Sequence, residues 1–127
     1  MRVAVATSKG GSDDTISNFF GRCPTCTFVE CEEGSIVKAE VLDNTGASSA
    51  EGAGKKTAQF LVKNGADVVV SGNFGPHSVK VLSSSGVKLV QAQGNVRETL
   101  GKYLAGDIKE VSRATVKEDY CKEKEDK

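Results

Sequence analysis

The fold of this chain is decided by residues 67–76, which read DVVVSGNFGP. The continuous apolar run Val68–Val70 is typical of a strand buried on both faces of a parallel sheet. Residues 71–75 form a glycine-containing loop, and Pro76 can open a helix because the first helical position needs no amide hydrogen. The stretch therefore predicts a parallel strand that ends in a loop and leads into a helix.

Strand and helix patterns alternate on both sides of this stretch. The expected strands are Arg2–Thr7, Thr25–Cys31, Ile36–Leu42, Asp67–Val70 and Val87–Val90. The expected helices are Lys55–Lys63, Pro76 to about Ser85, and a last helix that Asn95 caps and that ends at Leu104. The order β-β-β-α-β-α-β-α predicts an α/β fold. Its first three strands form an antiparallel meander, and its later βαβ units are parallel with right-handed crossovers. The result is a mixed five-stranded sheet flanked by helices.

Length and composition point to one soluble domain. The chain has 127 residues, with 17 Lys and Arg against 17 Asp and Glu, no Trp and 6% aromatic residues. This balance favours neither nucleic acid nor an anionic membrane as a partner, and no apolar run approaches the roughly 20 residues that span a bilayer. Without a signal-peptide pattern at the N-terminus we expect a cytoplasmic protein, whose thiols stay reduced. We expect residues 1–108 to form the domain and the charge-dense residues 109–127 to form a flexible tail.

The predicted topology gathers four loops at one edge of the sheet. The strand Thr25–Cys31 runs against the other four, so its beginning lies beside their carboxyl ends, where ligands of open α/β sheets bind. The loops that meet there are residues 8–22, 43–54, 71–77 and 91–95. Helices begin at this rim near Gly52, Pro76 and Asn95, and their free N–H groups favour an anion. Arg22 is the best candidate for a fixed positive charge there; Lys9 and Arg97 are weaker candidates.

A cysteine pair lies at the same rim, in residues 23–26, which read CPTC. Cys23 and Cys26 are spaced to share one metal or cluster, although they also fit as two small residues at the start of a strand. A thioredoxin-like redox role is disfavoured because a strand follows the pair, where that motif needs a helix. His77, the one histidine of the sequence, is a possible third ligand or a helix-capping residue.

The other two cysteines fit this pair less well. Cys31 lies five residues after Cys26, about 17 Å along a regular strand and on its opposite face, which predicts a small buried residue. Cys121 lies in the charged tail, as a free thiol or a ligand that folds back. The expected ligand set, Cys23, Cys26 and His77, is thus incomplete. A fourth ligand would come from Cys121, from the cargo or from a second subunit.

Four short motifs, in order, carry a family resemblance. They are Phe20-Gly21-Arg22, Gly52-Ala53-Gly54, residues 67–78 (DVVVSGNFGPHS) and Tyr103-Leu104-Ala105-Gly106. With these motifs the chain resembles the dinitrogenase iron–molybdenum cofactor biosynthesis family from about Arg2 to Ile108. The resemblance implies a ribonuclease H-like fold and the carrying of a metal–sulfur cluster. That cluster would be an iron–molybdenum cofactor precursor, or a molybdenum–copper sulfide cluster as in orange-protein relatives. Many members lack a thiol at the position of Cys26 and some at that of Cys23, so the pair hints at direct ligation here.

These observations predict a binding protein and not an enzyme. We expect Cys23, Cys26 and His77 to bind an iron–sulfur or molybdenum-containing cluster that donor and acceptor proteins deliver and receive. Arg22 would stabilise the negative charge of the cluster, and four glycines would let the backbone approach it closely: Gly52, Gly54, Gly72 and Gly75. These glycines also fit as plain turns, and no P-loop or dinucleotide fingerprint is present. No Ser-His-Asp spacing supports catalysis. The alternative is a metal-free regulatory or anionic-metabolite binding module that uses the same rim.

Overall fold

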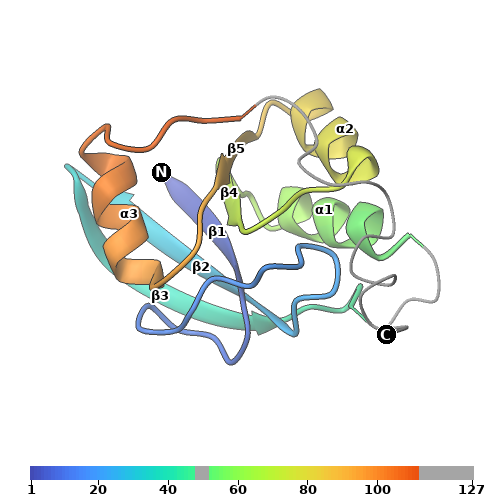
Figure 1. Ribbon diagram of the computed structural model, residues 1–127, viewed down its shortest axis with the longest axis horizontal. Helices are drawn as coiled ribbons and strands as arrows, with labels where there is room; N and C mark the ends of the chain where they lie inside the picture. Colours follow the sequence, from blue (N-terminus) through green and yellow to red (C-terminus); the bar gives the residue numbers. More distant parts are fainter. Residues whose placement is uncertain (48–51, 112–127) are drawn as a thin grey trace.

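The computed structural model describes residues 1–47 and 52–111, and within them it shows the predicted five-stranded mixed sheet and three helices (Figure 1). The elements are β1 (Arg2–Thr7), β2 (Thr25–Glu32), β3 (Ser35–Asp43), α1 (Ala53–Lys63), β4 (Val68–Ser71), α2 (Pro76–Ser84), β5 (Lys88–Gln91) and α3 (Val96–Leu104). The strand order is β3-β2-β1-β4-β5. β2 is antiparallel to β1 and β3, whereas β1, β4 and β5 are parallel. The predicted α/β class and ribonuclease H-like arrangement are confirmed.

The helices cover the sheet on both faces, α1 and α2 on one and α3 on the other (Figure 1). The alternation of side chains along each strand divides the core accordingly. Ala4, Phe28 and Val69 pack with Leu61 of α1 and Leu82 of α2. Their chain neighbours on the same strands pack against α3: Val3, Val5, Val29, Val68 and Val70. Burial on both faces explains why residues 68–70 are apolar without interruption.

Local signals fix the helix that closes the domain. Asn95 caps α3, and its side-chain Oδ1 accepts a hydrogen bond from the Glu98 amide at 3.0 Å. The chain remains packed against the sheet beyond Ile108, where the predicted domain ended. The Val111 amide donates a hydrogen bond to the Leu89 carbonyl of β5 at 2.8 Å. Residues 112–127, the rest of the predicted tail, lie outside the described residues. In the described parts of the chain, no helix has the length and apolar character needed to cross a membrane.

Candidate functional site

The loops that were predicted to meet are joined by hydrogen bonds at the rim of the sheet. Residues 15–22 form no helix, but their backbone is tied to the neighbouring loops. The Ile16 amide donates to Gly94 O at 2.8 Å, and the Gly72 amide donates to Ser17 O at 2.9 Å. Asn18 Oδ1 accepts from Asn73 Nδ2 at 2.8 Å. Three chain segments that lie far apart in sequence therefore form one surface at this edge.

The two thiols of the CPTC motif lie together beneath that surface. Cys26 is the second residue of β2, opposite Ala6 and Leu42, and Cys23 lies in the loop before the strand. Each side chain is only 1% exposed, and both belong to the core cluster under α1 and α2. Cys23 Sγ donates to Phe20 O at 2.9 Å.

Contact between the thiols controls the ionisation of Cys23. The hydrogen bond with the Cys26 thiol, followed by burial and by the charge of a Cys26 thiolate, raises the pKa of Cys23 well above its usual 9.0. A hydrogen bond from Asn44 acts in the opposite direction without reversing the shift. The Cys23 thiol is therefore protonated at neutral pH, and a metal that binds it must displace this proton.

Asn44 connects the cysteine loop to the loop after β3 and to α1. Its Nδ2 donates to Cys23 O at 2.9 Å and Gly21 O at 3.3 Å, and lies 3.5 Å from Cys23 Sγ. Its Oδ1 accepts from the Gly46 amide at 3.0 Å and from Thr57 Oγ1 at 3.1 Å. The residue is buried and uses every donor and acceptor that its amide offers to hold the loop over the thiols.

Three rim glycines allow parts of this chain to approach one another. A Cβ on Gly21 would lie 2.6 Å from Gly54 N, one on Gly54 2.5 Å from Ser78 Oγ, and one on Gly72 2.8 Å from Asn18 Cα. Gly54 and Gly72 therefore have a packing role whether or not they also face a ligand. Gly52 differs from them, because it precedes α1 with φ 69° and a Cβ there would meet nothing within 4 Å. Gly75 precedes α2 in an extended conformation.

Not every N–H group at the rim is available to a ligand. Asp14 closes the loop after β1, where its Oδ2 accepts from the amides of Ser8, Lys9 and Gly10 at 2.8–3.0 Å. Burial alone would raise the pKa of Asp14, but hydrogen bonds from backbone amides, including those three, lower it below its usual 3.8. A carboxylate of the chain itself thus pairs with three amides of this rim loop.

The start of α3 is satisfied by the chain as well. The Val96 amide donates to Asp14 O and the Arg97 amide to Ser12 O, both at 2.9 Å, and Asn95 caps the next turn. The Arg97 side chain binds Asp13 and Ser12. The sequence-based expectation that this helix start and Arg97 attract an anion is therefore corrected. The starts of α1 and α2 carry no side-chain cap. Arg22, near α1, is half-buried and donates to Ala47 O at 3.1 Å.

Comparison with known proteins identifies the family. A family model described as dinitrogenase iron-molybdenum cofactor matches residues 1–106. The chain belongs to the dinitrogenase iron-molybdenum cofactor family. The structure is similar to that of the apo orange protein from Desulfovibrio gigas, with a TM-score of 0.82 and 29% identity over 91% of this chain and 96% of that one. It is also similar to TM1290 from Thermotoga, with a TM-score of 0.74 and 28% identity over 91% and 97% of the two chains.

The chain is also similar in sequence to a protein of an archaeon. The protein MJ0580 of Methanocaldococcus jannaschii is 27% identical over 97 residues, which are 76% of this chain and 82% of that protein. The predicted family is confirmed, and the four motifs that indicated it, the last of which ends at Gly106, all lie within the matched residues.

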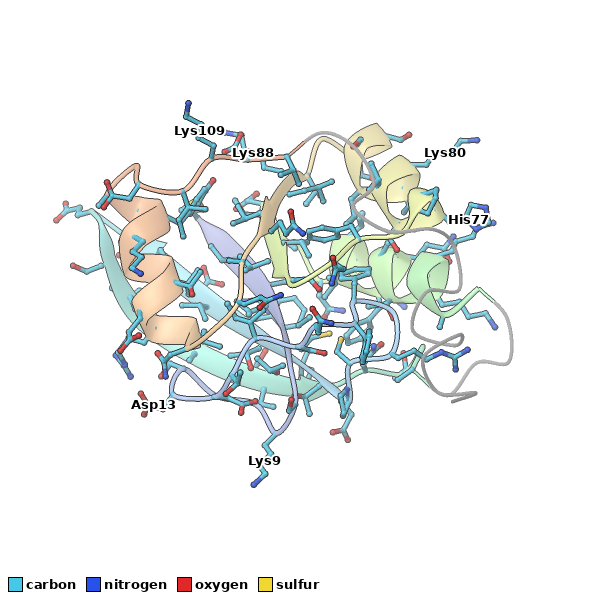
Figure 2. All side chains as sticks on the ribbon, viewed as in Figure 1. Lys9, Asp13, His77, Lys80, Lys88 and Lys109 are labelled. Carbon is cyan, nitrogen blue, oxygen red and sulfur yellow. The ribbon has the colours of Figure 1, made fainter. Side chains whose placement is uncertain are left out.

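The ligand set that the sequence suggested for this member of the family is only partly assembled. Cys23 and Cys26 are together, but His77 is exposed on the first turn of α2 and points outward (Figure 2). Its neighbour Ser78 is the residue of that turn that faces the core. Within residues 1–47 and 52–111, no group of three His, Cys, Asp or Glu side chains is placed to hold a metal ion.

The remaining candidates are placed as follows. Cys31 is buried against the α3 side of the sheet, on the face opposite Cys26, as its odd spacing predicted. Cys121 lies outside the described residues. Lys9 is exposed and extends away from the rim (Figure 2). Sequence reasoning missed Asn44 and Asp14. The one available signal was their residue type, since Asn and Asp in loops commonly hydrogen-bond backbone groups.

Proposed function

We propose that this protein carries a metal–sulfur cluster and that Cys23 and Cys26 are its thiolate ligands. The observation that supports this most directly is the contact between two soft-ligand side chains at the rim of a fold whose family is named for the dinitrogenase cofactor. Free cysteines among the described residues fit a reducing, cytoplasmic location. The cargo would be an iron–sulfur or molybdenum-containing cluster that a donor protein supplies and an acceptor protein takes.

The chemistry of the pair suits temporary binding. Binding requires both thiols to lose their protons, and the raised pKa of Cys23 means that its thiolate takes a proton back readily. Two protein ligands also leave other coordination positions of the cargo for its own sulfides or for an acceptor. A site of this kind holds a cluster less permanently than a complete set of four protein ligands.

Loading requires the cover over the thiols to open, because each is 1% exposed. The segment that has to move is the loop of residues 20–24, which Asn44 and Thr57 hold in place. Opening this loop would bring Arg22 and the uncapped start of α1, at Gly52 and Gly54, beside the cargo, where positive charge and amide hydrogens favour an anion. Gly72 and Gly75 precede α2, and we propose that their backbone also approaches the cargo; His77, exposed on the first turn of α2, would be a ligand only for cargo that extends to it.

The test is anaerobic reconstitution with iron, sulfide and molybdate, read by absorption and metal analysis. Cys23→Ser/Cys26→Ser should lose the cluster, whereas Cys31→Ser should keep it, because that equally buried thiol lies on the other face of the sheet. His77→Ala should retain most of the cluster, since the exposed imidazole is not with the thiol pair. Equal uptake by wild type and the double variant would refute thiol ligation.

If neither wild type nor variant takes up metal, the carrier proposal fails. The alternative is then a metal-free module that binds an anionic metabolite at Arg22 and the start of α1. Thermal shifts with phosphate and nucleotides, in wild type and Arg22→Gln, would show it: stabilisation by the anion that is lost in Arg22→Gln supports this alternative.

A further inference from the structure

β3 has an exposed outer edge that no described segment covers. It is the terminal strand of the sheet, and β2 is its one strand neighbour among the described residues (Figure 1). Five consecutive residues, 37–41, are exposed. Val37 and Val41 are 56% and 43% exposed, and they are two of the three large hydrophobic residues exposed in the described chain. A strand edge of this length is a template for pairing with another strand.

The side chains of residues 38–41 alternate regularly between the two faces of the sheet. Ala39 and Val41 lie opposite Val29 and Thr27 of β2, on the face that α3 covers. Lys38 and Glu40 lie opposite Glu30 and Phe28, on the other face. The register shift of the β2–β3 pairing leaves Val37 as the extra residue, opposite no residue of β2.

We propose that β3 pairs antiparallel with β3 of a second copy of this chain, about a two-fold axis at Ala39. In this register Lys38 lies opposite Glu40 of the second copy, and Glu40 lies opposite Lys38 of that copy. Val37 lies opposite Val41, and Ala39 lies opposite Ala39. Both charge pairs are on the face of the joined sheet opposite the one that α3 covers.

The sequence of β3 favours this register over its neighbours. An axis at Lys38 would place Lys38 opposite itself, and an axis at Glu40 would place Glu40 opposite itself, and like charges directly opposite are destabilising. A shift of one residue would pair Lys38 with Ala39 and bring charged and apolar side chains to the same face. Only the axis at Ala39 satisfies both charges and both valines, which is why a second copy fits better than an unrelated strand.

Glu40 already has one partner, which the pairing does not remove. Arg2 Nη2 lies 3.5 Å from Glu40 Oε1, and the Glu40 side chain remains 49% exposed. Its carboxylate therefore has room to accept Lys38 of the second copy as well. Five paired residues on each strand form a small contact, so the dimer should be weak and its population should rise with protein concentration.

The test is sedimentation velocity over a wide concentration range with the full chain. Wild type should shift from monomer to dimer, and Lys38→Glu or Glu40→Lys alone should raise the dissociation constant at least about tenfold, which is ~1.4 kcal/mol. An equimolar mixture of Lys38→Glu with Glu40→Lys should form a heterodimer, because each acidic edge then faces a basic one. Lys80→Glu, on the exposed side of α2, is the matched charge-reversal control and should dimerise as wild type does.

Recovery in the mixture also shows that the single variants are folded. The proposal is overturned if wild type stays monomeric throughout, if Lys38→Glu dimerises as wild type does, or if the mixture shows no more dimer than its components. None of these results bears on the thiol pair, so the carrier proposal and the dimer proposal succeed or fail separately.

Discussion

Replacing Asn44 by Ala tests whether one buried amide holds the cysteine loop. The change removes the donor to Cys23 O and the acceptor of the Gly46 amide, and both of these hydrogen bonds are buried. Gly21 O and Thr57 Oγ1 each lose their hydrogen bond to Asn44, but Thr57 Oγ1 still donates to Gly21 O at 3.1 Å. Two buried backbone groups thus lose these bonds, at about 1–3 kcal/mol each, so the free energy of unfolding should fall by about 3 kcal/mol.

Urea denaturation followed by circular dichroism measures this loss, with an unchanged m-value to show that the two-state comparison holds. For a chain of this size the melting temperature should fall by roughly 10 °C. Thr57→Val is the matched control. It removes the hydroxyl between the same two segments, but Gly21 O and Asn44 Oδ1 each keep another partner. Its cost should therefore be about 1 kcal/mol.

The reasoning is refuted if Asn44→Ala costs no more than Thr57→Val. In that case the Cys23 carbonyl and the Gly46 amide are satisfied by water when Asn44 is absent, and the loop is not held by this network. A large stability loss with unchanged cluster uptake would separate the two roles: Asn44 would stabilise the fold without controlling access to the thiols.

Further predictions concern packing, ionisation and access. Gly54→Ala should destabilise the protein by about 1–3 kcal/mol, because its Cβ would meet Ser78 Oγ, and adding Ser78→Ala should recover part of this loss in the same urea assay; no recovery would mean that another contact is responsible. Above pH 9 the unfolded metal-free chain loses the Cys23 proton that the native state keeps, so the free energy of unfolding should fall as pH rises, and less steeply in Cys23→Ser. Identical pH profiles would contradict the raised pKa. Iodoacetamide should modify Cys23 and Cys26 in the native metal-free protein far more slowly than in urea, as mass spectrometry can show; equal rates would contradict their burial.

The sheet and helices could be predicted because their signals are local. The run Val68–Val70 is apolar at each position because both faces of β4 are covered, and Asn95 caps α3 through a residue only three positions away. The face of Cys31 was predicted correctly because the extra residue of the β2–β3 irregularity is on β3, which leaves the alternation of β2 intact.

The site was less predictable because its contacts join residues far apart in sequence. Asn44 forms hydrogen bonds with Gly21 and Cys23, which precede it by 23 and 21 positions, and no local pattern marks these contacts. The direction of His77 was in principle readable, because Ser78 and Leu82 are the core-facing pair of α2 and a residue one position earlier is rotated away from them. The proline before His77 indicated where the helix begins, but it did not indicate which of its residues face the thiols.

The rim divides into a part that the chain closes itself and a part whose cover, we propose, opens. On the α3 side, Asp14 and Asn95 occupy the amides that a ligand would need, so an anion there would have to displace hydrogen bonds already formed. On the cysteine side, Asn44 and Thr57 hold the loop over the two thiols, which are the proposed ligands and would have to lose their protons to bind a metal. In the proposed carrier, the free-energy cost of loading would be the sum of opening the loop and deprotonating the pair, and reprotonation of the thiols on release would restore both contributions together. If the pair binds a cluster as proposed, this coupling accounts for its release, and variants that loosen the loop should speed loading and release alike.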